Sequence, residues 1–133
     1  MEYVIGCDVG SQAVKVLLLN AQGQVVGEAG SPYEIEYPQP AWAQQNPGHW
    51  LGAIISAIRQ LLNETGVHPS QVRVIALDAQ VDGVIAIDKA GKPLYPAIIW
   101  MDRRAVGQVE RIAESCDAGR LYDLSGLNLD AYH

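Results

Sequence analysis

The chain has 133 residues, of which 49% are hydrophobic and 18% are charged. This length predicts a single domain with one core, and the composition excludes a disordered chain and a membrane-spanning one. Nine Lys and Arg residues stand against fifteen Asp and Glu residues, so the net charge is −6. An acidic balance argues against a nucleic-acid partner, although a local site for an anion stays open.

The two cysteines, Cys7 and Cys116, lie far apart in apolar segments. This predicts reduced thiols in the core of a cytosolic protein rather than a disulfide. No basic, apolar leader precedes the first predicted strand, and no apolar run is long enough to cross a bilayer. We therefore expect a cytoplasmic protein without a membrane partner.

Three apolar runs open the chain and predict a β-meander, at residues 3–7, 14–19 and 24–29. The polar stretch 8–13 between the first two runs contains glycine and predicts a tight turn. Because a strand rather than a helix follows the first strand, the pattern excludes a Rossmann or P-loop beginning.

A proline-rich and aromatic segment, residues 31–45, is expected to be ordered but irregular. Asn46 and Pro47 then predict the cap and first residue of a helix over residues 47–65, which Gly66 ends. Apolar residues recur along this helix at helical spacing, namely Trp50, Ile54, Ile58 and Leu61.

A buried parallel strand is predicted at residues 72–77, because this run follows a helix and is apolar nearly throughout. Residues 84–87 and 98–100 are expected to form a hairpin around the turn at residues 88–93. The order of these elements predicts a mixed sheet with helices packed on it.

A second amphipathic helix is predicted over residues 103–117, and no clear element is predicted for residues 121–133. The residues of this helix that are expected to face inward are Val106, Val109, Ile112, Ala113 and Cys116.

Asp8, Gly10, Ser11 and Lys15 lie in or beside the first predicted turn and form the first candidate site. A glycine can adopt a positive φ and lets a phosphate approach the backbone, where successive N–H groups bind an anion. Ser11 adds a hydroxyl donor, and Lys15 adds a positive charge. Asp8, at the end of a strand, is suited to hold Mg²⁺ through water. An ordinary hairpin turn with a solvated lysine is the open alternative.

This hairpin, residues 5–11 with Lys15, resembles the phosphate hairpin of the actin/hexokinase-like ATPase superfamily. Three further segments resemble one branch of it, the FGGY carbohydrate kinases. Residues 41–47 (AWAQQNP) are similar to that family's Trp-x-Glu-Gln-Asp-Pro segment, and residues 96–104 (PAIIWMDRR) to its Trp-x-Asp-x-Arg signature. Residues 125–132 (SGLNLDAY) are similar to its Thr/Ser-Gly-Leu stretch. The order and spacing of all four motifs agree with the family.

The resemblance implies an α/β, ribonuclease H-like fold, the N-terminal domain of an actin/hexokinase-like ATPase with a mixed sheet and flanking helices. It implies transfer of the γ-phosphoryl group of MgATP to a hydroxyl of a small sugar or polyol. In this interpretation Asp8 organises Mg²⁺ through water, while Gly10, Ser11 and Lys15 cradle the β- and γ-phosphates.

The resemblance places substrate specificity in residues 80–83 (QVDG), at the carboxyl end of a predicted strand. The matching stretch resembles Gln-Arg-Glu-Thr in glycerol kinases and Gln-Met-His-Gly in xylulokinases. This chain keeps Gln80 and Gly83, has Val81 between them, and places Asp82 where an acid or histidine meets substrate hydroxyls. We expect the phosphate hairpin to face a carbohydrate cleft beside Asp82, and we prefer a xylulokinase-like assignment over a glycerol or other pentulose kinase.

The resemblance also assigns substrate contacts to Trp100, Asp102, Arg104 and Tyr132. Three of these have simpler interpretations. Asp102 is suited to cap the following helix, with Arg104 as a surface residue of its first turn, and Tyr132 lies where a chain end frays. Trp42, in the second motif, is expected to pack against the helix rather than to touch a ligand.

Members of the family are several times longer than this chain, and their general base and adenosine site lie downstream. The resemblance therefore implies an incomplete N-terminal domain over residues 1–133, without the second nucleotide-binding domain and inactive alone. Apolar surface at the missing junction predicts self-association, so a homodimer stays open. A non-catalytic actin-like scaffold and a sugar-binding pseudokinase remnant are the alternatives from other functional classes.

Overall fold

The computed structural model describes residues 1–132, so His133 lies outside the described residues. These residues form two compact units, the first from residues 1–35 and 46–80 and the second from residues 36–45 and from residue 81 onward. No helix within the described part of the chain is long and apolar enough to cross a membrane.

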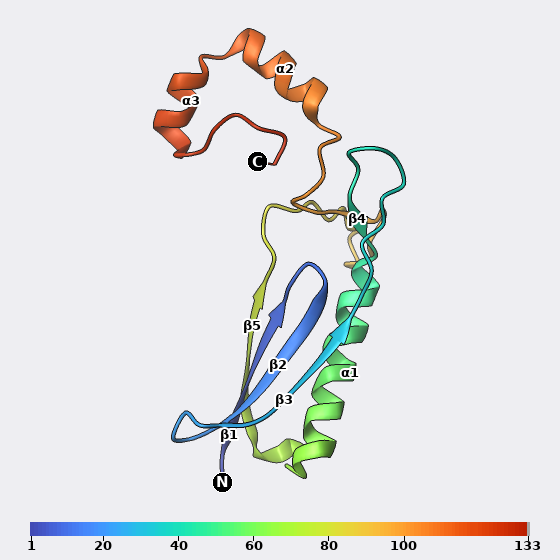
Figure 1. Ribbon diagram of the computed structural model, residues 1–133, viewed down its shortest axis with the longest axis vertical. Coiled ribbons are helices and arrows are strands. Elements are labelled where there is room, and N and C mark those ends of the chain that lie inside the picture. Colours follow the sequence, from blue (N-terminus) through green and yellow to red (C-terminus); the bar gives the residue numbers. More distant parts are fainter. Residues whose placement is uncertain (133) are drawn as a thin grey trace. The chain divides into compact units, whose positions relative to one another are not determined.

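The first unit is built on a mixed four-stranded sheet in the order β3-β2-β1-β5. Strands β1 (Tyr3–Val9), β2 (Ala13–Asn20) and β3 (Val25–Pro32) form an antiparallel meander, and β5 (Val72–Ala79) pairs with β1 in parallel (Figure 1). The predicted meander is therefore confirmed, and so is the parallel strand after the helix. A 3-10 helix, η1 (Pro69–Gln71), leads into β5.

Helix α1 (Pro47–Thr65) begins and ends at the predicted residues. The side chain of Asn46 accepts a hydrogen bond from the Gly48 N–H at 2.9 Å, and Pro47 occupies the first turn, where its missing donor costs nothing. Gly66 ends the helix in the left-handed conformation at φ 67°.

The core of the first unit lies between α1 and one face of the sheet. Alternate residues of β1 and β2 point to this face, and small residues on α1 let the helix come close. The buried side chains are Ile5, Cys7, Val9, Val14, Val16, Leu18, Ala53, Ala57, Leu61 and Val67. Cys7 therefore lies in the core, as predicted.

Gly27 of β3 lies directly against α1, and we expect its replacement by alanine to destabilise the first unit by about 1–3 kcal/mol. A Cβ atom at Gly27 would lie 2.5 Å from the Thr65 Cγ2 atom. Thr65 cannot turn aside freely, because its hydroxyl donates to the Leu61 carbonyl at 2.8 Å.

Urea unfolding followed by far-UV circular dichroism measures this effect. Gly6→Ala is the matched control, since a Cβ at Gly6 meets nothing within 4 Å. Adding Thr65→Ser, which removes Cγ2 and keeps the hydroxyl, should restore most of the loss. Equal stability of the Gly27 and Gly6 variants would show that the helix does not press on β3.

Strand β5 is exposed rather than buried, which corrects the prediction for residues 72–77. Leu77 is 67% exposed, and Val74 and Ile75 are about half exposed. Strand β5 lies at the edge of the sheet, and α1 packs mainly over β2 and β3, so the side chains of β5 are left without cover. A hollow of about 350 Å³ also lies beside it, lined by Val72 and Val74 and by residues of α1.

The second unit contains a short antiparallel ladder between β4 (Gln44–Gln45) and β6 (Ala97–Ile98). The hairpin predicted for residues 84–87 and 98–100 is reduced to isolated bridges, Val84 with Ile98 and Ile87 with Pro93. Prolines in the returning arm cannot donate to a ladder, and this explains the short pairing. The turn at residues 88–92 forms as expected, with the Asp88 N–H donating to the Lys92 carbonyl.

Two helices follow, α2 (Val106–Ser115) and α3 (Ala118–Ser125), and neither buries any of its described residues. The inward packing predicted for residues 103–117 is therefore wrong. Cys116 is exposed and does not belong to the core. Helix α3 was not predicted, although Asp117 caps it by accepting from the Gly119 and Arg120 N–H groups, and Gly126 ends it at φ 73°.

Candidate functional site

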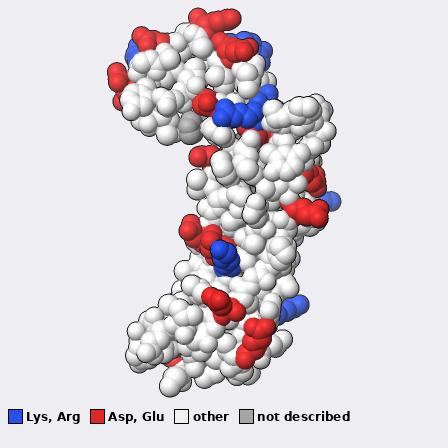
Figure 2. All heavy atoms as spheres, viewed as in Figure 1, with Lys and Arg blue, Asp and Glu red and all other residues white. Residues whose placement is uncertain are grey.

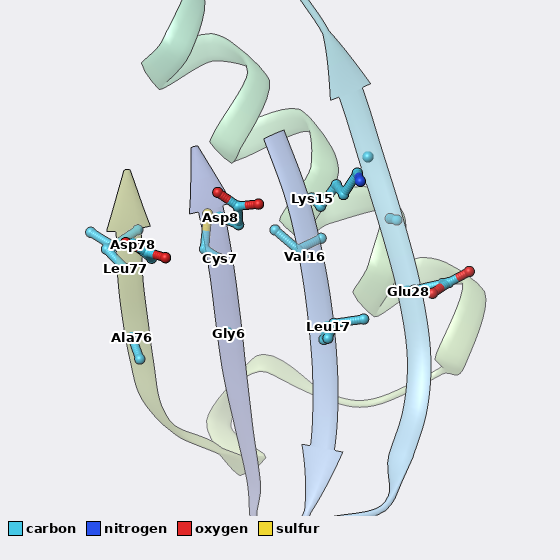
Figure 3. A pocket seen from close by; sticks show the side chains of 12 residues that line it. Gly6, Cys7, Asp8, Lys15, Val16, Leu17, Glu28, Ala76, Leu77 and Asp78 are labelled. Atoms are coloured by element: carbon cyan, nitrogen blue, oxygen red, sulfur yellow. The ribbon is translucent and has the colours of Figure 1, made fainter. Parts of the chain in front are cut away.

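A hollow of about 780 Å³ lies over the face of the sheet that points away from α1 (Figure 3). Several of the residues that line it are small, namely Gly6, Ala29, Gly30 and Ala76. All four strands also contribute a charged side chain to the lining: Asp8, Lys15, Glu28 and Asp78. The predicted Asp8 and Lys15 are therefore neighbours on one face, since they are paired across β1 and β2.

Asp78 is a residue that the sequence analysis did not single out. It is the register partner of Asp8 on the parallel strand β5, so both carboxylates lie at the carboxyl ends of adjacent strands. If the two strands are assumed to pair in parallel, their sequences place Asp78 beside Asp8, so Asp78 could have been predicted.

The Asp8 and Asp78 carboxylates fit Mg²⁺, which binds carboxylate oxygens and keeps several waters. Among residues 1–132, no group of three or more His, Cys, Asp or Glu side chains is placed to hold a metal directly. Asp8 and Asp78 therefore fit a contact through water better than a complete metal cage.

The turn between β1 and β2 is closed by its own backbone. The Gly10 N–H donates to the Ala13 carbonyl at 3.1 Å, so this group is engaged within the turn. Gly10 does not adopt a positive φ, which corrects the sequence analysis. A Cβ at this position would meet the Ala13 carbonyl oxygen at 3.4 Å, an ordinary contact.

Ser11 and Gln80, which are 69 residues apart, are brought together by this turn. The Ser11 hydroxyl donates to the Gln80 Oε1 atom at 3.1 Å, and the Gln80 N–H donates to the Val9 carbonyl at 2.9 Å. The predicted phosphate motif is therefore tied to the first residue of the predicted specificity segment.

Tyr33 supports the same turn and was not anticipated. Its hydroxyl donates to the Gly10 carbonyl, and its N–H donates to the Gln12 carbonyl at 3.0 Å. Burial, and then the nearby Asp8 carboxylate, raise the pKa of Tyr33, so the phenol stays a donor at neutral pH.

In the second unit, Asp102 and Arg104 form a buried ion pair. Asp102 is 4% exposed, and its Oδ2 atom lies 2.7 Å from the Arg104 Nη2 atom. The same carboxylate accepts the Ala43 N–H at 2.6 Å and the Arg104 N–H at 2.8 Å. Asp102 does not cap α2, whose N-cap is Ala105 without a side-chain hydrogen bond.

Arg104 is held from two more sides. Its guanidinium lies 3.8 Å from the centre of the Trp42 ring, and its Nη2 atom donates to the Gln44 Oε1 atom at 3.2 Å. Burial opposes ionisation of Asp102, but the hydrogen bonds from Arg104 and from the Ala43 N–H outweigh it. The pKa of Asp102 therefore lies below its usual value.

Trp100 and Tyr132, both predicted substrate contacts, lie together in the second unit. Their ring centres are 6.1 Å apart, and the planes are inclined by 36°. Arg103 lies 3.8 Å from the centre of the Tyr132 ring, and sequence reasoning did not single it out. The presence of two successive arginines, at residues 103 and 104, could have drawn attention to Arg103.

Val81 and Asp82 are exposed and begin the second of the two segments that make up the second unit. Asp82 has φ 59°, in the left-handed region that aspartate tolerates better than most residues. Because Asp8 belongs to the first unit, the shared cleft between Asp8 and Asp82 stays a prediction. On the face shown in Figure 2, acidic and basic side chains are scattered among uncharged ones.

Residues 3–133 match the N-terminal domain of the FGGY family of carbohydrate kinases. A glycerol kinase from Trichodesmium erythraeum is 33% identical over 132 residues, which cover 98% of this chain and 26% of that protein. The chain thus spans about a quarter of the length of the curated relatives that it matches.

Solved structures agree in fold. The ligand-bound xylulose kinase from Lactobacillus acidophilus has a TM-score of 0.89 at 22% identity, covering 99% of this chain and 26% of that one. The Plasmodium falciparum glycerol kinase with ADP has a TM-score of 0.80 at 24% identity, covering 99% and 27%. The fold is the ribonuclease H-like fold of actin/hexokinase-like ATPases. Since the match extends over nearly the whole sequence, the chain belongs to the FGGY family of carbohydrate kinases.

Proposed function

We propose that this chain is the N-terminal, substrate-side part of a kinase that transfers a phosphoryl group from ATP to a hydroxyl of a small sugar or polyol. The observation that carries this proposal is the Ser11–Gln80 hydrogen bond, which joins the phosphate hairpin to the specificity segment. Family membership over residues 3–133 supports the same reaction class.

The phosphate end of the site belongs to the hairpin. Asp8 holds Mg²⁺ through water, and Lys15 offsets the charge of the β- and γ-phosphates. Gly10 has no side chain and so lets a phosphate come close. Its N–H is not a free donor, because it is engaged in the turn. MgATP supplies the transferred group, so this part of the protein acts by positioning and by charge neutralisation.

The sugar end belongs to residues 80–82 with Trp100 and Tyr132. The Asp82 carboxylate can accept two hydroxyl hydrogen bonds, which suits vicinal hydroxyls of a polyol or ketose. We give Asp102 and Arg104 an indirect role, because their polar atoms are engaged with each other and with Ala43 and Gln44. They hold the loop that carries Trp100.

A xylulokinase-like substrate is our preferred assignment, with glycerol as the alternative that the similar proteins support. The attacking hydroxyl needs a carboxylate base, and the adenosine needs a binding surface. The family resemblance assigns both to the polypeptide beyond this quarter of the length. We therefore expect the 133-residue chain to bind ligands but not to turn over ATP.

Thermal unfolding of the chain with xylulose, glycerol or MgADP tests the proposal. A ligand at one hundred times its dissociation constant stabilises the native state by about 2.7 kcal/mol. Asp82→Asn keeps a residue that tolerates the left-handed backbone and should weaken sugar binding about tenfold. Glu114→Gln, on exposed helix α2, is the control.

Stabilisation by MgADP without any response to sugars would instead indicate a nucleotide-switched scaffold. Stabilisation by sugars alone would indicate a pseudokinase remnant. Release of ADP from ATP in the presence of a sugar would contradict the expectation that this chain is inactive alone.

A further inference from the structure

Arg103 lies at the centre of a group that we name the Arg103 latch, consisting of Arg103, Asp130, Tyr132 and Trp100. The Arg103 Nη1 atom donates to the Asp130 Oδ1 atom at 2.8 Å, and the guanidinium stacks on the Tyr132 ring at 3.8 Å. The Asp130 Oδ1 atom also accepts the Tyr132 N–H at 3.1 Å. The ring of Tyr132 is thereby held beside that of Trp100.

The arginine itself is anchored by the backbone. The Arg103 N–H donates to the Ala41 carbonyl at 2.8 Å, and both chain neighbours, Asp102 and Arg104, belong to the buried ion pair. Arg103 therefore projects from a fixed loop toward a partner 27 residues further along the chain.

Helix packing does not explain the position of residues 130–132. Helices α2 and α3, which connect the two sides of the latch, bury none of their described residues. Contacts at the latch therefore contribute to the position of Tyr132. An arginine suits this task, because its planar guanidinium can stack on a ring while it donates to a carboxylate, which a lysine cannot do equally well.

We propose that Arg103 is a positioning residue that holds Tyr132 against Trp100 and so builds an aromatic corner of the substrate pocket. The part of this proposal that concerns the substrate rests on the proposed function. Trp100 is 40% exposed, so the corner presents aromatic surface to a ligand. Aromatic rings with polar tips supply apolar contact and orientation together.

The test uses two-dimensional NMR of the 133-residue chain. Cross-peaks between the Trp100 and Tyr132 ring protons should be present in the wild type and lost in Arg103→Gln and Asp130→Asn. Arg103→Lys should restore them only in part, because it keeps the charge without the flat stacking. Arg111→Gln, at an exposed arginine of α2, should leave them unchanged.

Two further measurements separate positioning from general damage and from the proposed function. Urea midpoints should be the same for Arg103→Gln and Arg111→Gln, while the dissociation constant for xylulose or glycerol rises about tenfold only in Arg103→Gln. Retained ring cross-peaks in Arg103→Gln and Asp130→Asn would overturn the latch. If the cross-peaks vanish but the wild type binds neither sugar, the latch is supported and the proposed function fails.

Discussion

Replacing Asp102 by alanine should lower the free energy of unfolding of the second unit by about 3–5 kcal/mol. The substitution leaves the Arg104 guanidinium buried without its carboxylate and leaves the Ala43 N–H without its acceptor. Both losses occur where water has little access, since Asp102 is 4% exposed.

The measurement is urea unfolding followed by tryptophan fluorescence in a Trp50→Phe background. The remaining tryptophans, Trp42 and Trp100, then report only on the second unit. Asp123→Asn, an exposed carboxylate on α3, is the control and should change the stability by less than about 0.5 kcal/mol. A loss no larger in Asp102→Ala than in this control would mean that the ion pair does not stabilise the unit.

The same variant provides a pH signature. The pKa of Asp102 is lower in the folded state than in the unfolded state, where the pKa of an aspartate carboxyl is about 4. Its contribution is therefore fully present above that pH and is lost as the pH falls through the lower, folded value. The difference in stability between wild type and Asp102→Ala should be constant at neutral pH and should shrink below about pH 4.

Replacing Leu61 by alanine should cost the first unit about 2–5 kcal/mol. Leu61 is 0% exposed and lies between α1 and the sheet, so truncation leaves a cavity that the surrounding strands fill only in part. Far-UV circular dichroism during urea unfolding follows this unit, because α1 is its longest helix.

Leu51→Ala is the matched control on the same helix, because this leucine is 61% exposed. It removes the same atoms and leaves the core intact, so a shift of less than about 0.5 kcal/mol is expected. Similar losses in both variants would mean that helix propensity rather than core packing determines the result.

Local chemistry was enough to predict the parts of the fold that local contacts define. The bounds of α1 follow from Asn46 and Pro47 at one end and Gly66 at the other. Exposure was not predictable in the same way. The apolar run at residues 72–77 is typical of a strand covered on both faces, but its burial depends on neighbours that the run does not encode.

For the candidate site, the sequence indicated several residues and few of their partners. Trp100 and Tyr132, which were both named from the sequence, lie together, and Ser11 lies beside Gln80. Asp102 contacts Ala43 across 59 residues of chain, and Arg103 contacts Asp130 across 27. Pairings over such distances depend on topology, so no spacing rule could find them.

On the side that faces away from β1, strand β5 presents main-chain donors and acceptors with which no described strand pairs, and its apolar side chains are exposed to water. An unpaired strand edge of this kind can form backbone hydrogen bonds with an extended segment of another molecule. Concentrated preparations of the purified polypeptide will therefore tend toward insoluble aggregates, which seed from residues 72–79. We expect additives that bind the open edge of β5, rather than additives that stabilise the core, to keep the polypeptide in solution.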